Sequence, residues 1–415
     1  MQKVRMMKRY ADFLIEVGMH SVLRQDVVIY ADVDMSVFVR YLVGELYKAK
    51  VRRVQVVYHD QDITRQWVNN TPETRIPAAV TNLAERVAGY ARENMILVDL
   101  VGRDFHSLKR FSPNKLMATF QALSDSYQYF LAYATDRIKH VRAVVPTRDW
   151  AAEMYPDLTP SQALDHMWQQ LFAALELAEV RNDEAVMNHF SLVDRAEAAM
   201  NRKNLYRLHL TVPSVGTDLT VQLPLKGFWR SAVRTDTTRQ ETFVSYIPSG
   251  GIYTSTHSHG TDGVLAVTAP LYLYGERIAG ARLTFRNGEV VEATAETGAE
   301  ALNAFIQDVS ARRPGILTIS AFPAGPRQRL AGLGCNELNM ASPVALCLGQ
   351  SSADSLAGSE LMDRSERISH GLNQAYTRLS LPVYAPDLCI VGESIDPLGN
   401  RSNHTVYQKG RLVLD

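Results

Sequence analysis

The sequence predicts an α/β domain over residues 1–205, followed by a β-rich α+β domain over residues 206–415. Short apolar runs alternate with helical patterns in the first half. After about residue 205, strand-like runs separated by turn signals replace the long helices. The chain has 415 residues, enough for two or three domains of roughly 100–200 residues each.

The first half contains a strand–helix–strand unit. Strands are predicted over 26–30 and 54–58, with a helix over 35–48 between them whose apolar residues recur at helical spacing. Such a unit builds a parallel sheet that needs cover on both faces. Further strands are expected over 96–100 and 141–145.

A longer helix is predicted to begin just after Leu158. Thr159 suits the N-cap, Pro160 the first helical position, and Gln162 completes a capping box. One apolar stripe follows, which predicts a core-facing side: Leu164, Met167, Trp168, Leu171, Phe172 and Leu175.

The second half predicts strands over 219–223, 263–267 and 281–285. Asn287-Gly288 tolerates the positive φ angles of a type I′ turn, so a hairpin is expected there. The stretch 351–365 is rich in small polar residues and predicts a mobile loop.

The composition indicates which binding partners and which cellular compartment to expect. Lys+Arg and Asp+Glu are equal at 44 each, so no overall positive field favours nucleic acid or an anionic membrane. The three cysteines are too few for a disulfide framework. No apolar leader and no apolar run of about 18 residues is found. We expect a cytoplasmic location.

Several motifs, in this order, resemble the M29 (thermophilic, aminopeptidase T-like) metallopeptidases. They are VPTRDWA at 145–151, YPDL at 155–158, GTDLTV at 216–221, IPSGGIYT at 247–254, the hairpin region 274–292, and YQKGR at 407–411. The resemblance covers nearly the whole chain. It implies an α/β domain, a β-rich domain, and a homodimer that encloses active sites where two divalent metals activate water.

The residues that should bind those metals are missing. At the positions that the resemblance implies for them, this chain has Gly250-Gly251, Gly315-Ile316, Ala345 and Ser352. A final His-x-Asp pair should lie between Asn373 and Ser380, but no His-x-Asp occurs anywhere in the chain. We therefore expect a divergent member without the inherited metals, and not a conventional metalloaminopeptidase.

Two groups of residues remain that suggest chemistry. His257 and His259 share one side of a strand if they lie on one, and with Asp262 they offer part of a two-histidine, one-carboxylate metal site. Tyr376 and Arg378 suggest an anion-binding wall, because arginine recognises carboxylates bidentately. The alternatives are a polar loop with exposed histidines and an ordinary surface arginine.

The sequence thus leaves two functions open. The favoured one is a repurposed, metal-free protein that binds or modifies a small peptide or amino-acid-like molecule, possibly as a pathway partner. Its ligand-binding residues would be Tyr376, Arg378, His257 and His259, with Arg378 pointing toward Gly251 and His257. The alternative is a metalloenzyme with iron or zinc at His257, His259 and Asp262. It would be a non-haem iron dioxygenase of the 2,5-dihydroxypyridine type, which this fold also resembles, or a metal-dependent hydrolase or aminopeptidase.

Overall fold

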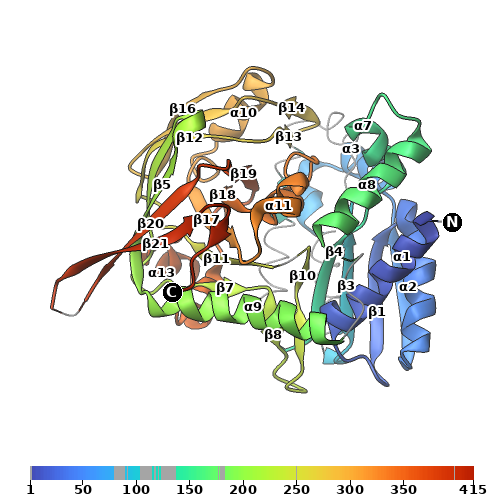
Figure 1. The fold of residues 1–415 in the computed structure, drawn as a ribbon. Helices are drawn as coiled ribbons and strands as arrows, with labels where there is room; N and C mark the ends of the chain where they lie inside the picture. Colours follow the sequence, from blue (N-terminus) through green and yellow to red (C-terminus); the bar gives the residue numbers. More distant parts are fainter. Residues whose placement is uncertain are drawn as a thin grey trace. The chain divides into compact units, whose positions relative to one another are not determined.

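The computed structural model describes residues 2–78, 89, 90, 92–102, 115, 118, 119, 121, 122, 137–175, 177, 183–248, 250–396 and 398–415. The chain forms two compact units (Figure 1). Unit 1 contains Met1–Val186 and Ala232–Ser249, and unit 2 contains Met187–Ser231 and Gly250–Asp415. These units do not coincide with the predicted ranges 1–205 and 206–415. The predicted fold class, α/β followed by β-rich α+β, is confirmed.

Unit 1 is built on a five-stranded sheet in the order β10-β4-β3-β1-β2, in which every neighbouring pair is parallel. The predicted strands lie close to where the sequence placed them. The strands are β1 (Asp26–Asp32), β2 (Arg53–His59), β3 (Ile96–Val101), β4 (His140–Val144) and β10 (Tyr246–Ile247). The helices are α1 (Gln2–Phe13), α2 (Ser36–Lys48), α3 (Gln61–Asn70), α7 (Arg148–Met154) and α8 (Pro160–Ala174).

The predicted start of α8 is confirmed in detail. Thr159 and Gln162 form the capping box, with Pro160 in the first turn. On the predicted apolar stripe, Met167, Trp168 and Leu171 are buried. The ring centres of Trp168 and Tyr10 lie 5.6 Å apart, so α8 packs against α1 through an aromatic contact.

A segment from the second half of the chain returns to unit 1. Its hairpin of β8 (Val233–Thr235) and β9 (Thr242–Val244) is followed by β10, which pairs with β4. The buried ammonium of Lys139 lies 2.5 Å from a carboxylate oxygen of Glu241. A buried cation needs such a partner, so this ion pair holds the returning hairpin in unit 1.

Unit 2 is built on two large antiparallel sheets. The larger has the order β16-β15-β12-β6-β5-β20-β21-β22, and the smaller β19-β18-β17-β11-β7. The larger sheet comprises β5 (Leu205–Val212), β6 (Thr217–Gln222), β12 (Thr261–Ala266), β15 (Arg282–Arg286), β16 (Glu289–Thr294), β20 (Cys389–Ile395), β21 (Arg401–Gln408) and β22 (Arg411–Leu412). The smaller comprises β7 (Arg230–Ser231), β11 (Gly251–Ser255), β17 (Pro314–Ser320), β18 (Val344–Gly349) and β19 (Arg378–Pro382).

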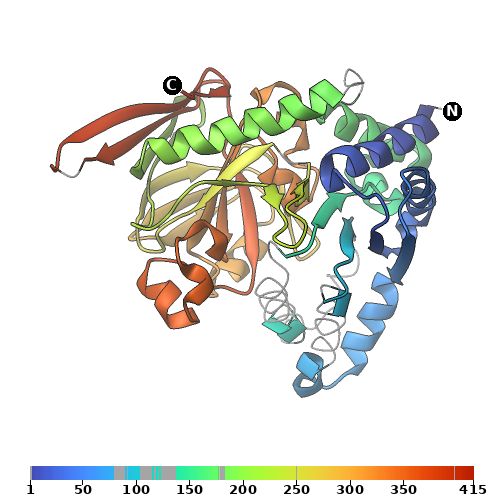
Figure 2. The same ribbon diagram turned by 90° about the horizontal axis from the view of Figure 1, so that it is seen from below.

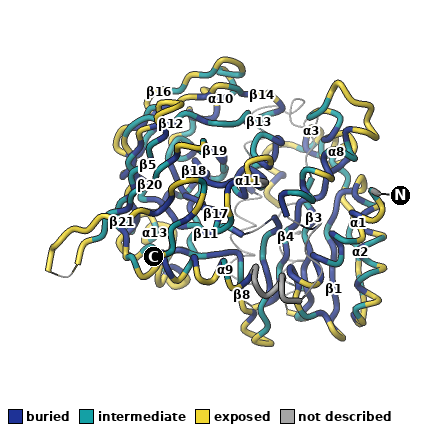
Figure 3. Tube along the Cα trace, in the orientation of Figure 1, coloured by how far each residue is buried: buried dark blue, intermediate teal, exposed yellow. Residues whose placement is uncertain are grey.

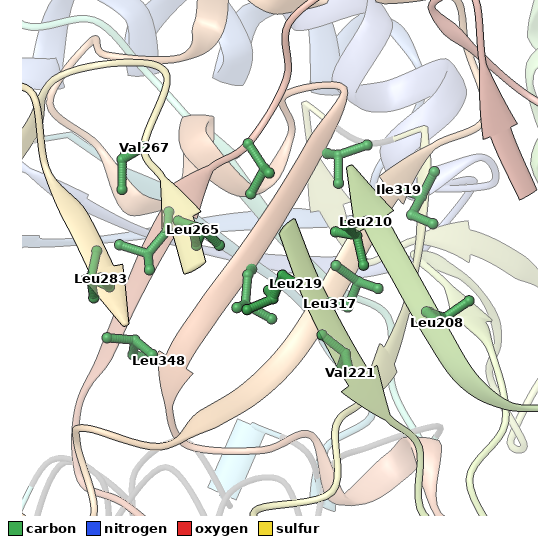
Figure 4. Packing of buried hydrophobic residues seen from close by; sticks show 14 of the residues in the cluster. Leu208, Leu210, Leu219, Val221, Leu265, Val267, Leu283, Leu317, Ile319 and Leu348 are labelled. Atoms are coloured by element: carbon green, nitrogen blue, oxygen red, sulfur yellow. The ribbon is translucent and has the colours of Figure 1, made fainter. Parts of the chain in front are cut away.

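One apolar core joins these two sheets. Leu208, Leu219 and Leu265 of the larger sheet belong to the same buried cluster as Leu317 and Leu348 of the smaller one (Figure 4). In Figure 3, β17 and β18 are mostly dark blue, whereas the far end of the β20–β21 hairpin is yellow. The smaller sheet is therefore buried along its middle strands.

The remaining elements of unit 2 are the strands β13 (Leu271–Leu273) and β14 (Glu276–Ile278), and the helices α9 (Asp183–Arg202), α10 (Ala299–Ile306), α11 (Ala324–Arg327), α12 (Asn336–Met340) and α13 (Arg364–Ser369). The first residues of α9 belong to unit 1. The stretch predicted as a mobile loop, 351–365, contains two short 3-10 helices and the start of α13. Figure 2 shows the two 3-10 helices and α13, in orange, gathered in unit 2. Within the described residues, no helix combines the length and apolar character needed to cross a membrane.

Candidate functional site

The smaller sheet of unit 2 has two unlike faces. Directly opposed residues of antiparallel strands point to the same face, and the register places one row of residues across four strands. This cross-strand row is Ser255, Ile316, Cys347 and Ser380. The alternate residues, such as Leu317 and Leu346, lie in the apolar core. The row therefore belongs to the opposite face, where side chains are also buried.

Two of the positions implied for metal ligands lie on this second face. Ile316 belongs to the cross-strand row, and Ala345 lies two residues before Cys347 on β18, so their side chains point to the same side. Both are fully or almost fully buried. Neither side chain has an atom that coordinates a metal, so these two residues do not fit the metals that the resemblance implies.

Cys347 supplies no reactive thiolate on this face. Burial raises the pKa of its thiol, while the charge of Arg378 and a hydrogen bond with Ser380 act against the shift. Its Sγ lies 3.4 Å from the hydroxyl oxygen of Ser380. A buried thiol in such surroundings behaves as a small apolar side chain.

Neighbouring side chains leave no room for a side chain at Gly250, the first position implied for a metal ligand. Ser249 lies outside the described residues, but Gly250 has φ +119°, which favours glycine. A Cβ added to Gly250 would lie 2.4 Å from the ring of Phe322 and 2.6 Å from a guanidinium nitrogen of Arg327. That guanidinium is 4.7 Å from the centre of the Phe322 ring. A glutamate therefore does not fit at this position without rearrangement.

The register separates Gly251 from Arg378. Gly251 pairs with Ser320 at one end of β17, whereas Arg378 pairs with Gly349, which lies beside the other end of β17. At about 3.3 Å per residue, the two ends are roughly 20 Å apart along the strands. The predicted orientation of Arg378 toward Gly251 is therefore wrong.

Around Arg378, the structure places groups that donate hydrogen bonds. Arg378 Nε donates to the carbonyl oxygen of Gln350 at 3.2 Å. Two residues earlier, Tyr376 Oη accepts a hydrogen bond from Arg364 Nη1 at 3.2 Å. The same Arg364 guanidinium lies 5.2 Å from the centre of the Tyr376 ring. Tyr376 and Arg378 lie in the stretch where the resemblance implies a His-x-Asp pair, and Arg364 contacts Tyr376. Such donors suit an anion better than a metal.

His257 and His259 lie close together, with their ring centres 6.2 Å apart. Arg313 Nη1 donates to His259 Nδ1 at 3.0 Å and to the Ser258 carbonyl at 3.0 Å. The backbone N–H of His259 donates to His257 Nδ1 at 3.2 Å. A guanidinium and a backbone N–H both only donate, so both Nδ1 atoms act as acceptors and carry no proton here. Burial, and then the charge of His259, lowers the pKa of His257.

Asp262 has a structural role at the neighbouring hairpin. Its Oδ1 accepts a hydrogen bond from the backbone N–H of Asn287 at 2.8 Å. Asn287 and Gly288 have φ angles of 50° and 75°, so the predicted turn is confirmed. In the part of the chain that the structure describes, no three His, Cys, Asp or Glu side chains form a group able to hold a metal. His257, His259 and Asp262 are therefore not assembled into one.

Of the predicted ligand-binding residues, the structure brings His257 and His259 together and leaves Tyr376 and Arg378 in a separate group. No hydrogen bond or ring contact links Arg378 to either histidine within the described residues. Both groups lie at the same end of the sheet, because Gly349, the partner of Arg378, donates from its backbone N to the Arg313 carbonyl at 2.7 Å.

Sequence reasoning missed two residues at these groups, Arg364 and Arg313. Arg364 follows the capping residue Asp363 of α13, and this capping box was the only signal available for its helix. Arg313 immediately precedes β17. Neither contact has a signature in sequence spacing, since Arg313 reaches His259 from 54 residues away.

A parallel-sheet unit and a double-sheet antiparallel unit, with the implied ligand positions Ile316 and Ala345 on the smaller sheet, match the two-domain architecture that the resemblance implies. The family model described as thermophilic metalloprotease (M29) matches residues 3–412, and the chain belongs to this family. Aminopeptidase T of Thermus aquaticus is 28% identical over 98% of this chain and 98% of its own length. Aminopeptidase AmpS of Bacillus subtilis (strain 168) is 25% identical over 93% of this chain and 94% of its own.

Solved structures agree with this fold. Wild-type AmpT from Thermus thermophilus superposes with a TM-score of 0.82 at 23% identity, covering 99% of both chains. A 2,5-dihydroxypyridine dioxygenase from Pseudomonas putida KT2440 gives a TM-score of 0.51 at 13% identity, covering 98% of this chain and 96% of its own. At these identities the similarity concerns the fold alone.

Proposed function

We propose that this M29-family chain has lost the inherited dinuclear metal site and binds a small peptide or amino-acid-like molecule through its carboxylate. The observation that carries the proposal is the positive charge of the side chains at the position implied for the last pair of metal ligands, His-x-Asp. Arg378 and the Arg364–Tyr376 contact stand where a histidine and an aspartate would be needed. Metal ligands must be neutral imidazoles or deprotonated acids, and a guanidinium repels a cation.

The donors around Arg378 match a carboxylate. Arginine presents paired N–H groups whose geometry fits the two oxygens. Tyr376 Oη accepts a hydrogen bond from Arg364 Nη1, and both side chains are proposed as polar neighbours of the ligand carboxylate. His257 and His259 are proposed as polar neighbours at the same end of the sheet. The proposal includes a homodimer and a cytoplasmic location.

A metal-dependent aminopeptidase is the alternative, and the relatives favour it. The curated relatives named above are aminopeptidases, and they match almost the whole chain. An aminopeptidase would require metal ligands other than Gly250, Ile316, Ala345 and Ser352. The dioxygenase alternative rests on fold similarity alone.

Calorimetric titration with N-acetyl-L-leucine, and with N-acetyl-L-leucinamide as the uncharged match, tests the proposed function. We expect the acid to bind more tightly than the amide. Arg378→Ala should weaken binding of the acid by about 1.5–3 kcal/mol, the range for hydrogen bonds to charged groups. Arg286→Ala, at an exposed arginine on β15, is the matched control and should change nothing. Equal binding of acid and amide would refute a carboxylate site.

A further inference from the structure

A second candidate site lies within unit 1, at the carboxyl ends of parallel strands β1 and β2. Asp32 ends β1, His59 ends β2, and the register pairs these two residues. Open parallel sheets bind ligands outside the carboxyl ends of their strands. Neither the family resemblance nor the proposed function assigns a role to this edge, so the inference does not rest on either.

The carboxylate of Asp32 is buried and only partly satisfied. Its side chain is 7% exposed. One oxygen, Oδ1, accepts the backbone N–H of Asp34 at 3.0 Å. The other, Oδ2, has no hydrogen-bond partner among the described residues and faces His59, whose Nε2 is 3.7 Å away. A buried carboxylate oxygen without a donor is unfavourable, and such a group calls for an explanation.

A hollow of about 460 Å³ opens beside this pair. It is lined by Val33, Tyr58, His59, Asp60, Ile63 and Thr64. Its volume lies within the range of small-molecule sites. Val33, Tyr58 and Ile63 are each more than 40% exposed, so the hollow has apolar walls that face solvent.

The polar groups of the hollow favour a ligand that donates hydrogen bonds. Among the residues that the structure describes, those that line it include no lysine or arginine. At the N-terminus of α3, Asp60 Oδ1 already accepts from the N–H groups of Asp62 and Ile63 at 2.8 and 3.1 Å, which leaves fewer amides for an anion. If His59 directs an Nε2–H toward Asp32, its Nδ1 is an acceptor for a ligand. Asp60 adds a carboxylate.

We propose that this hollow binds a small primary amine with an apolar body. The ammonium donates to the acceptor groups of His59 and Asp60. Asp32, behind His59, is a positioning residue that supplies uncompensated negative charge. The apolar body packs against Val33, Tyr58 and Ile63, and a cation near the Tyr58 ring adds attraction.

Calorimetric titration of the full chain with 2-phenylethylamine tests this site, with 2-phenylethanol as the uncharged match. We expect the amine to bind about tenfold more tightly than the alcohol or better, equivalent to about 1.4 kcal/mol. Asp32→Asn keeps an acceptor for Asp34 but removes the charge, and should weaken amine binding about tenfold while leaving alcohol binding unchanged. An unaltered amine affinity in this variant would exclude the positioning role of Asp32.

A second variant keeps the proposal testable if Asp32→Asn does not fold. Ile63 is 65% exposed on α3, so Ile63→Arg adds a cation to the hollow without disturbing the core. It should abolish binding of the amine. Ile368→Arg is the matched control, at an isoleucine 48% exposed on α13 of unit 2. The proposal is overturned if the two arginine variants bind 2-phenylethylamine equally well, or if amine and alcohol bind alike.

Discussion

Arg313 donates a hydrogen bond to His259 Nδ1 at 3.0 Å, and its other terminal nitrogen pairs with Glu289. The guanidinium thereby ties the connection between β11 and β12 to the hairpin turn between β15 and β16. Because a guanidinium only donates, His259 Nδ1 is the acceptor of this bond.

We predict that the free energy of unfolding falls as the pH drops below about 6.5. Burial lowers the pKa of His257 below its ordinary value of 6.5, and burial lowers that of His140 to about 4. Above 6.5 both histidines are neutral in the folded and unfolded chains. Below it, the unfolded chain takes up protons that the folded chain does not, so stability is lost.

Urea titration at about pH 7.5 and about pH 5.5 measures this loss. His257→Gln removes one of the two histidines whose pKa burial lowers, so the variant should lose less stability between the two pH values. An equal loss in the variant and the parent would show that His257 does not contribute to the acid sensitivity.

Restoring a side chain at Gly250 should destabilise the protein. Its φ of +119° is strained for any other residue, and an added Cβ would clash with Phe322 and Arg327. Gly250→Ala should cost about 1–3 kcal/mol of unfolding free energy. Gly325→Ala is the matched control, since a Cβ there meets nothing within 4 Å. Equal denaturation midpoints for the two variants would show that Gly250 is not constrained.

Much of the fold was predictable because its signals are local. The capping box of Thr159 and Gln162, the turn at Asn287-Gly288 and the parallel strand–helix–strand unit each depend on neighbouring residues. The return of β10 to the sheet of unit 1 is not local. Tyr246 pairs with Arg142 across about a hundred residues, and no turn or periodic pattern encodes that pairing.

The candidate site was less predictable, for the same reason. The resemblance placed Ile316, Ala345 and Arg378, but only the register separates Arg378 from Gly251. The stretch 351–365 looked like a loop because its small polar residues carry no apolar periodicity. Its short helices are instead held by hydrogen bonds such as that of Ser355 Oγ to Ser255 Oγ at 2.9 Å, from 100 residues away.

Asn373, at the start of the stretch implied for the last metal ligands, should prove structural. Its buried Nδ2 donates to the carbonyls of Ser310 and Gly349 at 2.7 and 2.8 Å. Asn373→Ala leaves both acceptors unpaired and should cost about 1–3 kcal/mol. Asn373→Asp should cost more, since a carboxylate repels two carbonyls. Asn403→Ala, at an exposed position on β21, is the control. A neutral Asn373→Asp change, measured by urea denaturation, would disprove this role.

We predict that the chain forms a homodimer, as the family resemblance implies. Light scattering at micromolar concentration should give twice the chain mass of 46.4 kDa. The mass should stay constant on moderate dilution if the interface is of the obligate kind. A monomer at all concentrations would mean that each chain works without a partner copy.

Metal content tests the central claim most directly. Protein incubated with zinc, cobalt or manganese, and then freed of unbound metal, is analysed by inductively coupled plasma mass spectrometry. On our proposal, the apolar side chains of Ile316 and Ala345 and the guanidinium of Arg378 take the places of inherited metal ligands. We predict metal well below one equivalent per chain, and no hydrolysis of aminoacyl anilides that a chelator abolishes. Two tightly held metal ions per chain, with chelator-sensitive hydrolysis, would contradict the account.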